Sequence, residues 1–139
     1  MKGERMRNYQ KESYTNIQPH IDQKDEVLNW CIGLAEEVGE TFNHIKHCFY
    51  GNEELNKEEI SKEIGDCLWY LSALCSSLNI DLKTVAQLNL EKLKFRFQKN
   101  EFSEEESKNR KKSDVKFKDT VLYKNLIKEL DYDLHINRM

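Results

Sequence analysis

Apolar side chains recur at steps of three and four residues along two long stretches of this sequence, and this spacing limits the fold more than any other feature. The first stretch runs from about Lys24 to Phe49, and the second runs from about Asn56 to Leu78. A period near 3.6 residues places such side chains on one face of an α-helix. The 139 residues include one proline and five glycines, so signals for turns and strands are scarce. We therefore predict an all-α fold.

Two further helices are expected within the same body. Asp81 has a side chain that can cap a helix, and the helix that it begins is predicted to extend to about Phe97. A shorter helix is expected from about Met6 to Thr15. With the two long stretches, these segments predict a bundle of four to five helices.

The amino-acid composition of the chain changes after Gln98. The segment NEFSEEESKNRKKSD is polar, with an acidic block followed by a basic one, and we predict a surface loop or linker there. Helical spacing resumes from about residue 115 to residue 136. We therefore predict one main domain over residues 1–110, and a linker with a C-terminal amphipathic helix over residues 111–139. This helix is expected to dock on the bundle or on a partner subunit, with a structural role at a subunit contact.

Length, charge and cysteine content limit the class of protein. A chain of this size can form one domain with its own core. The net charge of −3 supplies no basic field for a nucleic-acid polymer. The four cysteines show no CxxC spacing, and no apolar run approaches the roughly 20 residues of a membrane span. We predict a soluble, reduced, cytoplasmic protein that does not bind membranes.

Five acidic residues form two closely spaced sets on the long helices. Glu36, Glu37 and Glu40 lie on the first helix, and Glu63 and Asp66 lie on the second. A spacing of three residues puts Glu37 with Glu40, and Glu63 with Asp66, on one face of each helix. Two such pairs facing each other would supply four oxygen ligands, and without a cation their charges would repel. The spacing predicts a divalent-metal site between the helices.

A structural zinc site and a di-iron site are two alternatives to this metal site. His44, His47 and Cys48 lie close together on one helix, but they lack the second ligand pair that a structural zinc site needs. A di-iron bundle also uses glutamates from facing helices, but its Glu-x-x-His motif does not precede any of the four histidines. The ordinary reading of a single Glu-x-x-Glu on a charged helix is a solvated face.

The motifs resemble one enzyme family. GLAEEVGE, the stretch from EIGDCLWYL to LKFRF, and EFSEEESKNR together resemble the MazG-like nucleotide pyrophosphohydrolases over roughly residues 25 to 110. The resemblance implies an all-α enzyme that cleaves a nucleoside triphosphate between its α- and β-phosphates. It implies Mg²⁺, or Mn²⁺, held by Glu37, Glu40, Glu63 and Asp66. The loop sequence RFQKNEFS departs from the family, which tends to have RYP and a glycine before FS.

Carboxylates suit such a substrate, because Mg²⁺ usually combines protein carboxylates with substrate phosphates and water. We expect Glu63 to be required for catalysis, and Glu36 or Glu37 to accept a proton from the attacking water. A triphosphate also needs cationic and polar partners, and the candidates for substrate binding are Lys46, Tyr70, Asn89, Lys92, Arg96 and Arg110. Asn89 and Arg110 are assigned by the resemblance alone. For the lysines, a solvated helix face is the ordinary alternative.

The sequence leaves several functions open. The leading prediction is a Mg²⁺-dependent hydrolase of nucleoside triphosphates, with deoxynucleotides as substrates, acting as a homodimer or homotetramer whose pockets, by resemblance, are completed from two chains. An all-α dUTPase and a phosphoribosyl-ATP pyrophosphohydrolase are alternatives that the metal ligands alone do not separate. A helical module that binds nucleotides without cleaving them is the alternative outside enzymes.

Overall fold

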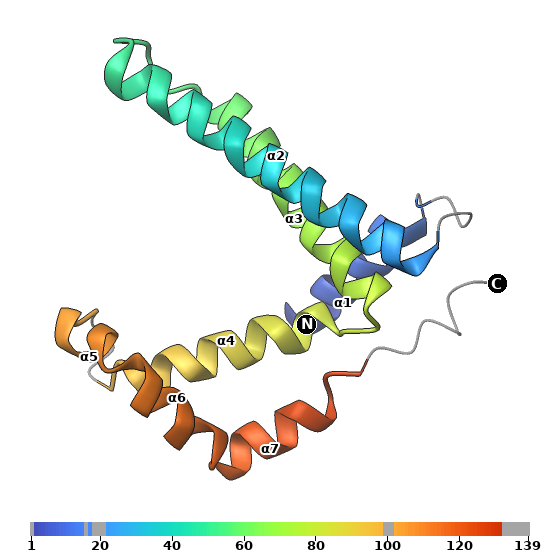
Figure 1. Cartoon of the computed structure of the whole chain (residues 1–139), viewed down its shortest axis with the longest axis vertical. Coiled ribbons are helices and arrows are strands. Elements are labelled where there is room, and N and C mark those ends of the chain that lie inside the picture. The colour runs from blue at the N-terminus through green and yellow to red at the C-terminus, as the bar shows by residue number, and fades with distance from the viewer. Residues whose placement is uncertain (1, 16, 18–21, 99–101, 132–139) are drawn as a thin grey trace. The chain divides into compact units, whose positions relative to one another are not determined.

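The fold is entirely helical in the part of the chain that the structure describes. A computed structural model describes residues 2–15, 17, 22–98 and 102–131. These residues form seven helices and no strand (Figure 1): α1 (Lys2–Thr15), α2 (Gln23–Tyr50), α3 (Lys57–Ser77), α4 (Leu82–Arg96), α5 (Glu104–Lys108), α6 (Arg110–Lys118) and α7 (Val121–Lys128). The all-α prediction is confirmed, and there are more helices than the four to five that were expected. None of the described helices combines the length and apolar character that crossing a membrane would require.

The chain divides into two compact units. Residues 8–78 form one, called here the hairpin unit, and residues 1–7 with 79–139 form the other, called here the terminal unit. One boundary falls inside α1 and the other falls after α3. This division follows contacts within the chain, so the predicted domain limits at residues 1–110 and 111–139 stay a prediction.

The hairpin unit is built on α2 and α3, which lie side by side in antiparallel directions (Figure 1). The turn between them occupies residues 51–56 and includes Asn52, whose φ of 54° is left-handed. Asn56 then begins α3, because its side-chain oxygen accepts hydrogen bonds from the backbone N–H groups of Glu58 and Glu59. The two long helices predicted from apolar spacing are therefore present, each within one or two residues of the predicted ends.

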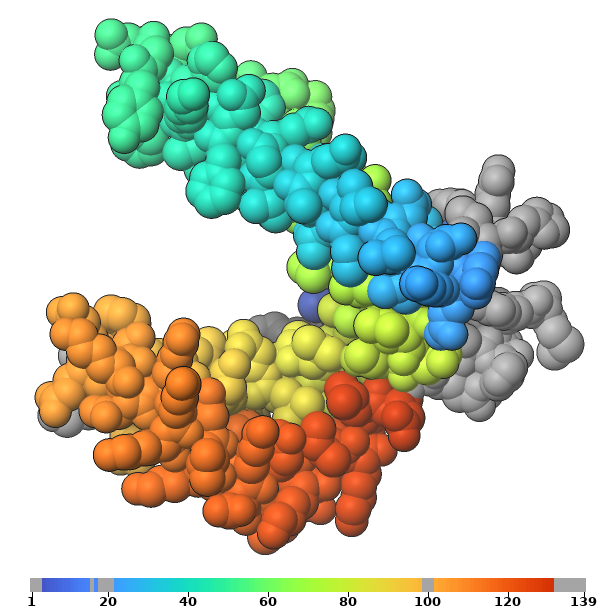
Figure 2. Space-filling view, in the orientation of Figure 1, coloured from blue at the N-terminus to red at the C-terminus, as the bar shows by residue number. Residues whose placement is uncertain are grey.

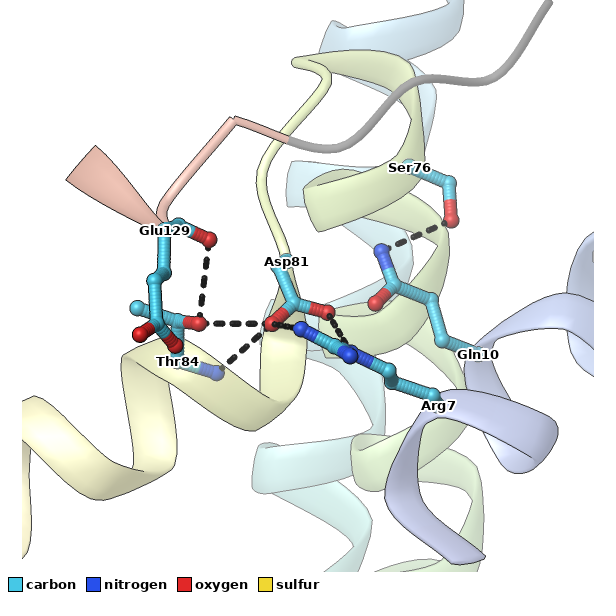
Figure 3. A network of polar contacts seen from close by, with 6 residues as sticks. All are labelled: Arg7, Gln10, Ser76, Asp81, Thr84 and Glu129. Carbon is cyan, nitrogen blue, oxygen red and sulfur yellow. Dashed lines mark hydrogen bonds and ion pairs between the residues drawn. The ribbon is translucent and has the colours of Figure 1, made fainter. Parts of the chain in front are cut away.

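Polar side chains form much of the interior of the hairpin unit. Gln10 Nε2 donates to Ser76 Oγ at 3.3 Å (Figure 3), and the hydroxyls of Ser13 and Ser72 lie 2.7 Å apart. All four side chains are buried. Because each of these groups has a partner, their burial does not leave an unsatisfied donor or acceptor. The contact between α1 and α3 is therefore a hydrogen-bonded one.

The apolar interior of the hairpin unit is small. Among its described residues, Trp30 and Ala73 are the buried hydrophobic side chains. Trp30 Nε1 donates to Ser77 Oγ at 2.9 Å, which fixes the indole between α2 and α3. Large apolar residues lie instead on an exposed side of the hairpin, here called the apolar side: Leu28, Ile32, Val38, Phe42 and Phe49 on α2, Ile64, Leu68 and Leu71 on α3, and Leu78 directly after α3. Figure 2 shows much of the surface of α2 open to solvent.

The terminal unit is organised around the start of α4. The buried carboxylate of Asp81 accepts hydrogen bonds from Arg7 Nε and Nη2, both at 3.3 Å, and from the backbone N–H of Thr84 at 3.1 Å (Figure 3). The Thr84 hydroxyl lies 2.6 Å from Asp81 and 3.1 Å from the carbonyl oxygen of Glu129. The N–H of Asp81 donates to Leu130 O at 2.7 Å. Asp81 therefore caps α4, as predicted, and also joins it to the chain after α7.

Two predictions for the second half of the chain were wrong. The polar segment expected to be a loop contains α5 and the start of α6, and Ser103 caps α5 by accepting from Glu106 N. The expected single helix over about residues 115–136 is broken between α6 and α7. Thr120 causes the break, because its hydroxyl accepts from Tyr123 N and begins a new helix. Residues 132–136 of the expected helix lie outside the described residues.

The C-terminal helices pack within their own unit. Phe117 of α6 and Leu126 of α7 are buried, with 4% of each exposed. The ring of Phe117 lies 5.7 Å from that of Phe95 on α4 and 5.4 Å from that of Tyr123 on α7. Residues beyond 110 therefore supply core to the terminal unit. Their predicted role at a subunit contact is a separate matter and stays a prediction.

Candidate metal centre

Three of the predicted metal ligands meet between α2 and α3. Glu37 of α2, and Glu63 and Asp66 of α3, each offer one carboxylate oxygen, and these oxygens all lie within 4.8 Å of one another. Glu63 and Asp66 share a face because they are three residues apart on one helix, and α2 brings Glu37 opposite them. The two helices thus place three hard donor atoms at one point in the hairpin unit.

The other two acidic residues of the predicted site lie at its edge. Glu40 and Glu36 are exposed, and neither belongs to the group of three oxygens. The charge of Glu40 nevertheless acts on Glu37, and the charge of Glu36 acts on Tyr70. Both carboxylates are therefore close enough to influence the site electrostatically, and their roles as ligand and base stay predictions.

The pKa of the Glu37 carboxyl group is affected by the negative charges around it. Its pKa is raised above the ordinary value of 4.5, first by partial burial and then by the charges of Asp66 and Glu40 and by a hydrogen bond with Glu63. Each of these effects disfavours the ionised form. A cation among the three oxygens would reverse the effect of the neighbouring charges, because it stabilises ionised carboxylates.

The donor set fits a hard divalent cation. Mg²⁺ takes oxygen ligands in octahedral geometry and keeps several positions for water and substrate phosphates. Three carboxylates from two helices fill part of such a shell and leave the rest open. Glu63 has 13% of its side chain exposed, Glu37 is also partly buried, and Asp66 is exposed. The residues present therefore suit Mg²⁺ or Mn²⁺.

Tyr70 lies beside these carboxylates and is held by its packing. Its ring rests directly on Gly33, where an added Cβ would collide with the ring and come within 2.8 Å of the hydroxyl oxygen. The rings of Trp69 and Trp30 lie 5.1 and 6.2 Å from that of Tyr70. Burial, and then the charges of Glu37, Glu36 and Asp66, raise the pKa of Tyr70 above its ordinary 10. The hydroxyl therefore stays a hydrogen-bond donor at neutral pH.

Sequence reasoning missed Gly33 and Glu59 at this place. Gly33 gives the Tyr70 ring its room, and the available signal was its position four residues before Glu37, on the same face of α2. Glu59 lies four residues before Glu63 and belongs to a neighbouring group of ligand atoms with His44. Extending the helical spacing one turn back from Glu63 would have found it.

The remaining predicted residues fall into both units. Lys46 is exposed on α2, and the other four candidates belong to the terminal unit: Asn89, Lys92, Arg96 and Arg110. Arg96 Nη2 donates to Asp114 at 2.7 Å, and its buried Nε has no hydrogen-bond partner among the described residues. Arg96 therefore has at least one structural partner. Substrate contacts for all five residues stay predictions.

A pocket of about 370 Å³ lies in the terminal unit, lined by seven residues of α4, the segment just after α4, α6, α7 and the turn before α7. The lining includes the aromatic rings of Phe95 and Phe117 and the charged side chains of Glu91 and Lys94. It includes none of the predicted site residues. The carboxylate group, not this pocket, carries the chemistry that the sequence indicates.

Comparisons with known proteins place most of this region in one family. The sequence model of the MazG nucleotide pyrophosphohydrolase domain matches residues 26–100, which is more than half of the chain and includes all five acidic residues. The chain is also 35% identical over 69 residues to the Gene 37 protein of Mycobacterium phage L5, across 47% of this chain. It spans 60% of the length of that relative. No solved structure matches the chain.

Proposed function

The chain belongs to the MazG nucleotide pyrophosphohydrolase family, and we propose that it hydrolyses nucleoside triphosphates, preferably deoxynucleotides, to the monophosphate and pyrophosphate with Mg²⁺. The observation that carries this proposal is the meeting of Glu37, Glu63 and Asp66 within 4.8 Å between α2 and α3. Mn²⁺ would serve the same oxygen ligands.

We assign the metal to Glu37, Glu63 and Asp66, with Glu40 as a fourth ligand after a change of side-chain conformation. When bound, the cation neutralises charge on the phosphates and orients them for in-line attack. The protein supplies the fixed geometry, because α2 and α3 hold the carboxylates before substrate arrives. Loss of Glu63 should be the most damaging single change, since only 13% of its side chain is exposed to water and it accounts for one of the three oxygens.

Water adds across the α–β anhydride bond in this reaction. A new bond forms between the water oxygen and phosphorus, the bond from that phosphorus to the bridging oxygen breaks, and pyrophosphate leaves. Glu37 or Glu36 accepts the proton that the water gives up. Tyr70 donates a hydrogen bond to a phosphate oxygen, because its raised pKa keeps the hydroxyl protonated. Lys46, Asn89, Lys92, Arg96 and Arg110 are proposed to bind the phosphates or the sugar.

A second copy of the chain is proposed to cover the apolar side of the hairpin. Phe42 is 68% exposed, Ile32 59% and Ile64 56%, while Trp30 and Ala73 are the buried apolar side chains described in this unit. Monomeric soluble proteins rarely leave extended apolar patches in water. A homodimer or homotetramer would bury these side chains and supply the core that the hairpin lacks.

The test is pyrophosphate release from phosphoribosyl-ATP and from a panel of ribonucleoside and deoxynucleoside triphosphates that includes dUTP, with Mg²⁺, with EDTA and with Glu63→Gln. We expect release that needs both the metal and Glu63. Glu58→Gln is the matched control, because Glu58 is an exposed glutamate on the same helix outside the carboxylate group. It should keep wild-type activity.

The outcomes separate the alternatives. Release from dUTP alone would identify a dUTPase, and release from phosphoribosyl-ATP alone would identify that pyrophosphohydrolase. If nucleotide and metal bind while no pyrophosphate is released from any substrate, the protein is a nucleotide-binding module and the proposed activity is wrong.

A further inference from the structure

A second group of ligand atoms adjoins the carboxylates. His44 of α2, with Glu59 and Glu63 of α3, each offer one nitrogen or oxygen, and these atoms all lie within 4.8 Å of one another. His44 Nε2 lies 3.5 Å from Glu63 Oε1. All three side chains are half-buried. The group therefore combines an imidazole nitrogen of α2 with two carboxylates of α3.

The two groups follow one another along α2 and α3. His44 comes seven residues after Glu37, which is two turns of α2, and Glu59 comes four residues before Glu63, which is one turn of α3. Because the helices are antiparallel, both steps lead in the same direction, away from Asp66. Glu63 belongs to both groups. A carboxylate has two oxygens, so this one side chain can serve a cation on each side.

The chemistry of the second group differs from that of the first. Glu37, Glu63 and Asp66 offer oxygen alone, which suits Mg²⁺. An imidazole nitrogen is a softer donor that suits first-row cations such as Zn²⁺ and Fe²⁺ better than Mg²⁺. Mn²⁺ belongs to the same row and also suits carboxylates, so it can occupy both positions and report on them. The ligands thus predict different cation preferences at two neighbouring positions.

The ammonium group of Lys62 would compete with a metal cation for the carboxylate of Glu59. Its Nζ lies 2.8 Å from Glu59 Oε1, in an ion pair whose two side chains are 55% and 39% exposed. Exposed pairs of this kind contribute little to stability, because water screens the two charges. A divalent cation held by three side chains would replace this contact at small cost, so Lys62 does not block the site.

We propose that His44, Glu59 and Glu63 form a second divalent-cation site, selective for a transition cation, that shares Glu63 with the carboxylate site. Paired cations joined by a common carboxylate are the arrangement that enzymes use to hold both the attacking and the leaving oxygen of a phosphoryl group. The second site rests on the proposed function in that Glu63 is assigned to both cations. Its occupancy can be measured without nucleotide.

The experiment counts Mn²⁺ bound per chain, using the electron paramagnetic resonance signal of free Mn²⁺ with the full-length protein. We expect two Mn²⁺ per chain for the wild type and one for His44→Ala. The matched control is His47→Ala, one turn further along α2, where the imidazole lies 3.8 Å from exposed Glu53 and outside the ligand group. It should keep two. Excess Mg²⁺ should displace one Mn²⁺ from the wild type and leave the other.

Glu59→Gln is a second variant that should also bind one Mn²⁺. Far-UV circular dichroism of each variant establishes that the helices are intact before binding is compared. One Mn²⁺ per chain in the wild type, or two in a folded His44→Ala protein, would overturn the proposal. Pyrophosphate release is measured separately. A wild type that binds two Mn²⁺ but releases no pyrophosphate would contradict the proposed function and still support the second site.

Discussion

The carboxyl group of Glu37 gives the hairpin unit a dependence on pH. Its raised pKa means that the folded state holds this proton more tightly than the unfolded state. Below the unfolded pKa of about 4.5, the carboxyl group is protonated in both states and does not lower the free energy of unfolding. Once the pH exceeds the folded pKa, the ionised carboxylate lowers the free energy of unfolding. In EDTA, we expect the free energy of unfolding of Glu37→Gln to rise relative to the wild type as the pH increases from about 4.5 through the raised folded pKa of Glu37.

Urea unfolding at a series of pH values measures this difference. Glu12→Gln on α1 is the control, since Glu12 is exposed and lies outside the carboxylate group. This variant measures the general effect of replacing a glutamate in the protein. A difference for Glu37→Gln that does not change with pH would mean that burial and the charges of Asp66 and Glu40 do not raise the pKa of Glu37.

Two glycines on α2 predict opposite responses to alanine. At Gly33 an added Cβ collides with the Tyr70 ring, whereas at Gly39 it meets nothing within 4 Å. Gly39→Ala should therefore stabilise the protein by about 0.5–1 kcal/mol, because alanine favours helix. Gly33→Ala should destabilise it by about 1–3 kcal/mol, the usual cost of overpacking. Thermal unfolding of both variants checks this, and equal shifts in Tm would show that the Tyr70 ring moves aside freely.

The carboxylates could be predicted from the sequence because their geometry is local. Glu63 and Asp66 share a face of any α-helix, and long apolar stripes made both helices predictable. The packing of Tyr70 on Gly33 could not be predicted, because it depends on how α2 and α3 are rotated against each other. No local spacing encodes that rotation. The role of each carboxylate as a ligand is still a prediction.

Asp81 gives α4 a start that depends on one side chain. Asp81→Ala removes the cap on Thr84 N and the partner of Arg7, and we expect it to cost about 1–3 kcal/mol of unfolding free energy. Arg7→Ala should cost less, since the Arg7 side chain is 49% exposed and the cap remains. Urea unfolding of both variants measures the two costs. A larger loss for Arg7→Ala would mean that the ion pair, and not the cap, holds this junction.

The helices differ in how well the sequence predicted them. The starts of α3 and α4 were predicted closely because a capping side chain and the apolar spacing agree there, at Asn56 and Asp81. The ends of α2 were predicted from its apolar spacing alone, since its start has no side-chain cap. The break between α6 and α7 was missed because the apolar spacing continues past it. Thr120 ends one helix and begins the next by capping α7. A single threonine is a weaker sequence signal than the repeated leucines that predict one continuous helix. The short helix α5 was missed because acidic residues dominate its sequence.

On the scale of the whole molecule, the apolar side of the hairpin predicts self-association. Ile32 and Ile64 lie on this side and are 59% and 56% exposed. In a dimer that buries them, a lysine at either position would place a charge in an apolar contact, at a cost that leaves the monomer favoured. We expect the wild type to have at least twice the mass of one chain, and the double variant Ile32→Lys/Ile64→Lys to have the mass of one chain.

Light scattering after size-exclusion chromatography measures these masses. The control is Asn29→Lys, which adds the same charge at an exposed polar position of α2. It should keep the mass of the wild type. Since folding is linked to association, Tm of the wild type should also rise with protein concentration, and that of the double variant should not. A wild type with the mass of one chain at every concentration would show that a second copy does not cover the apolar side.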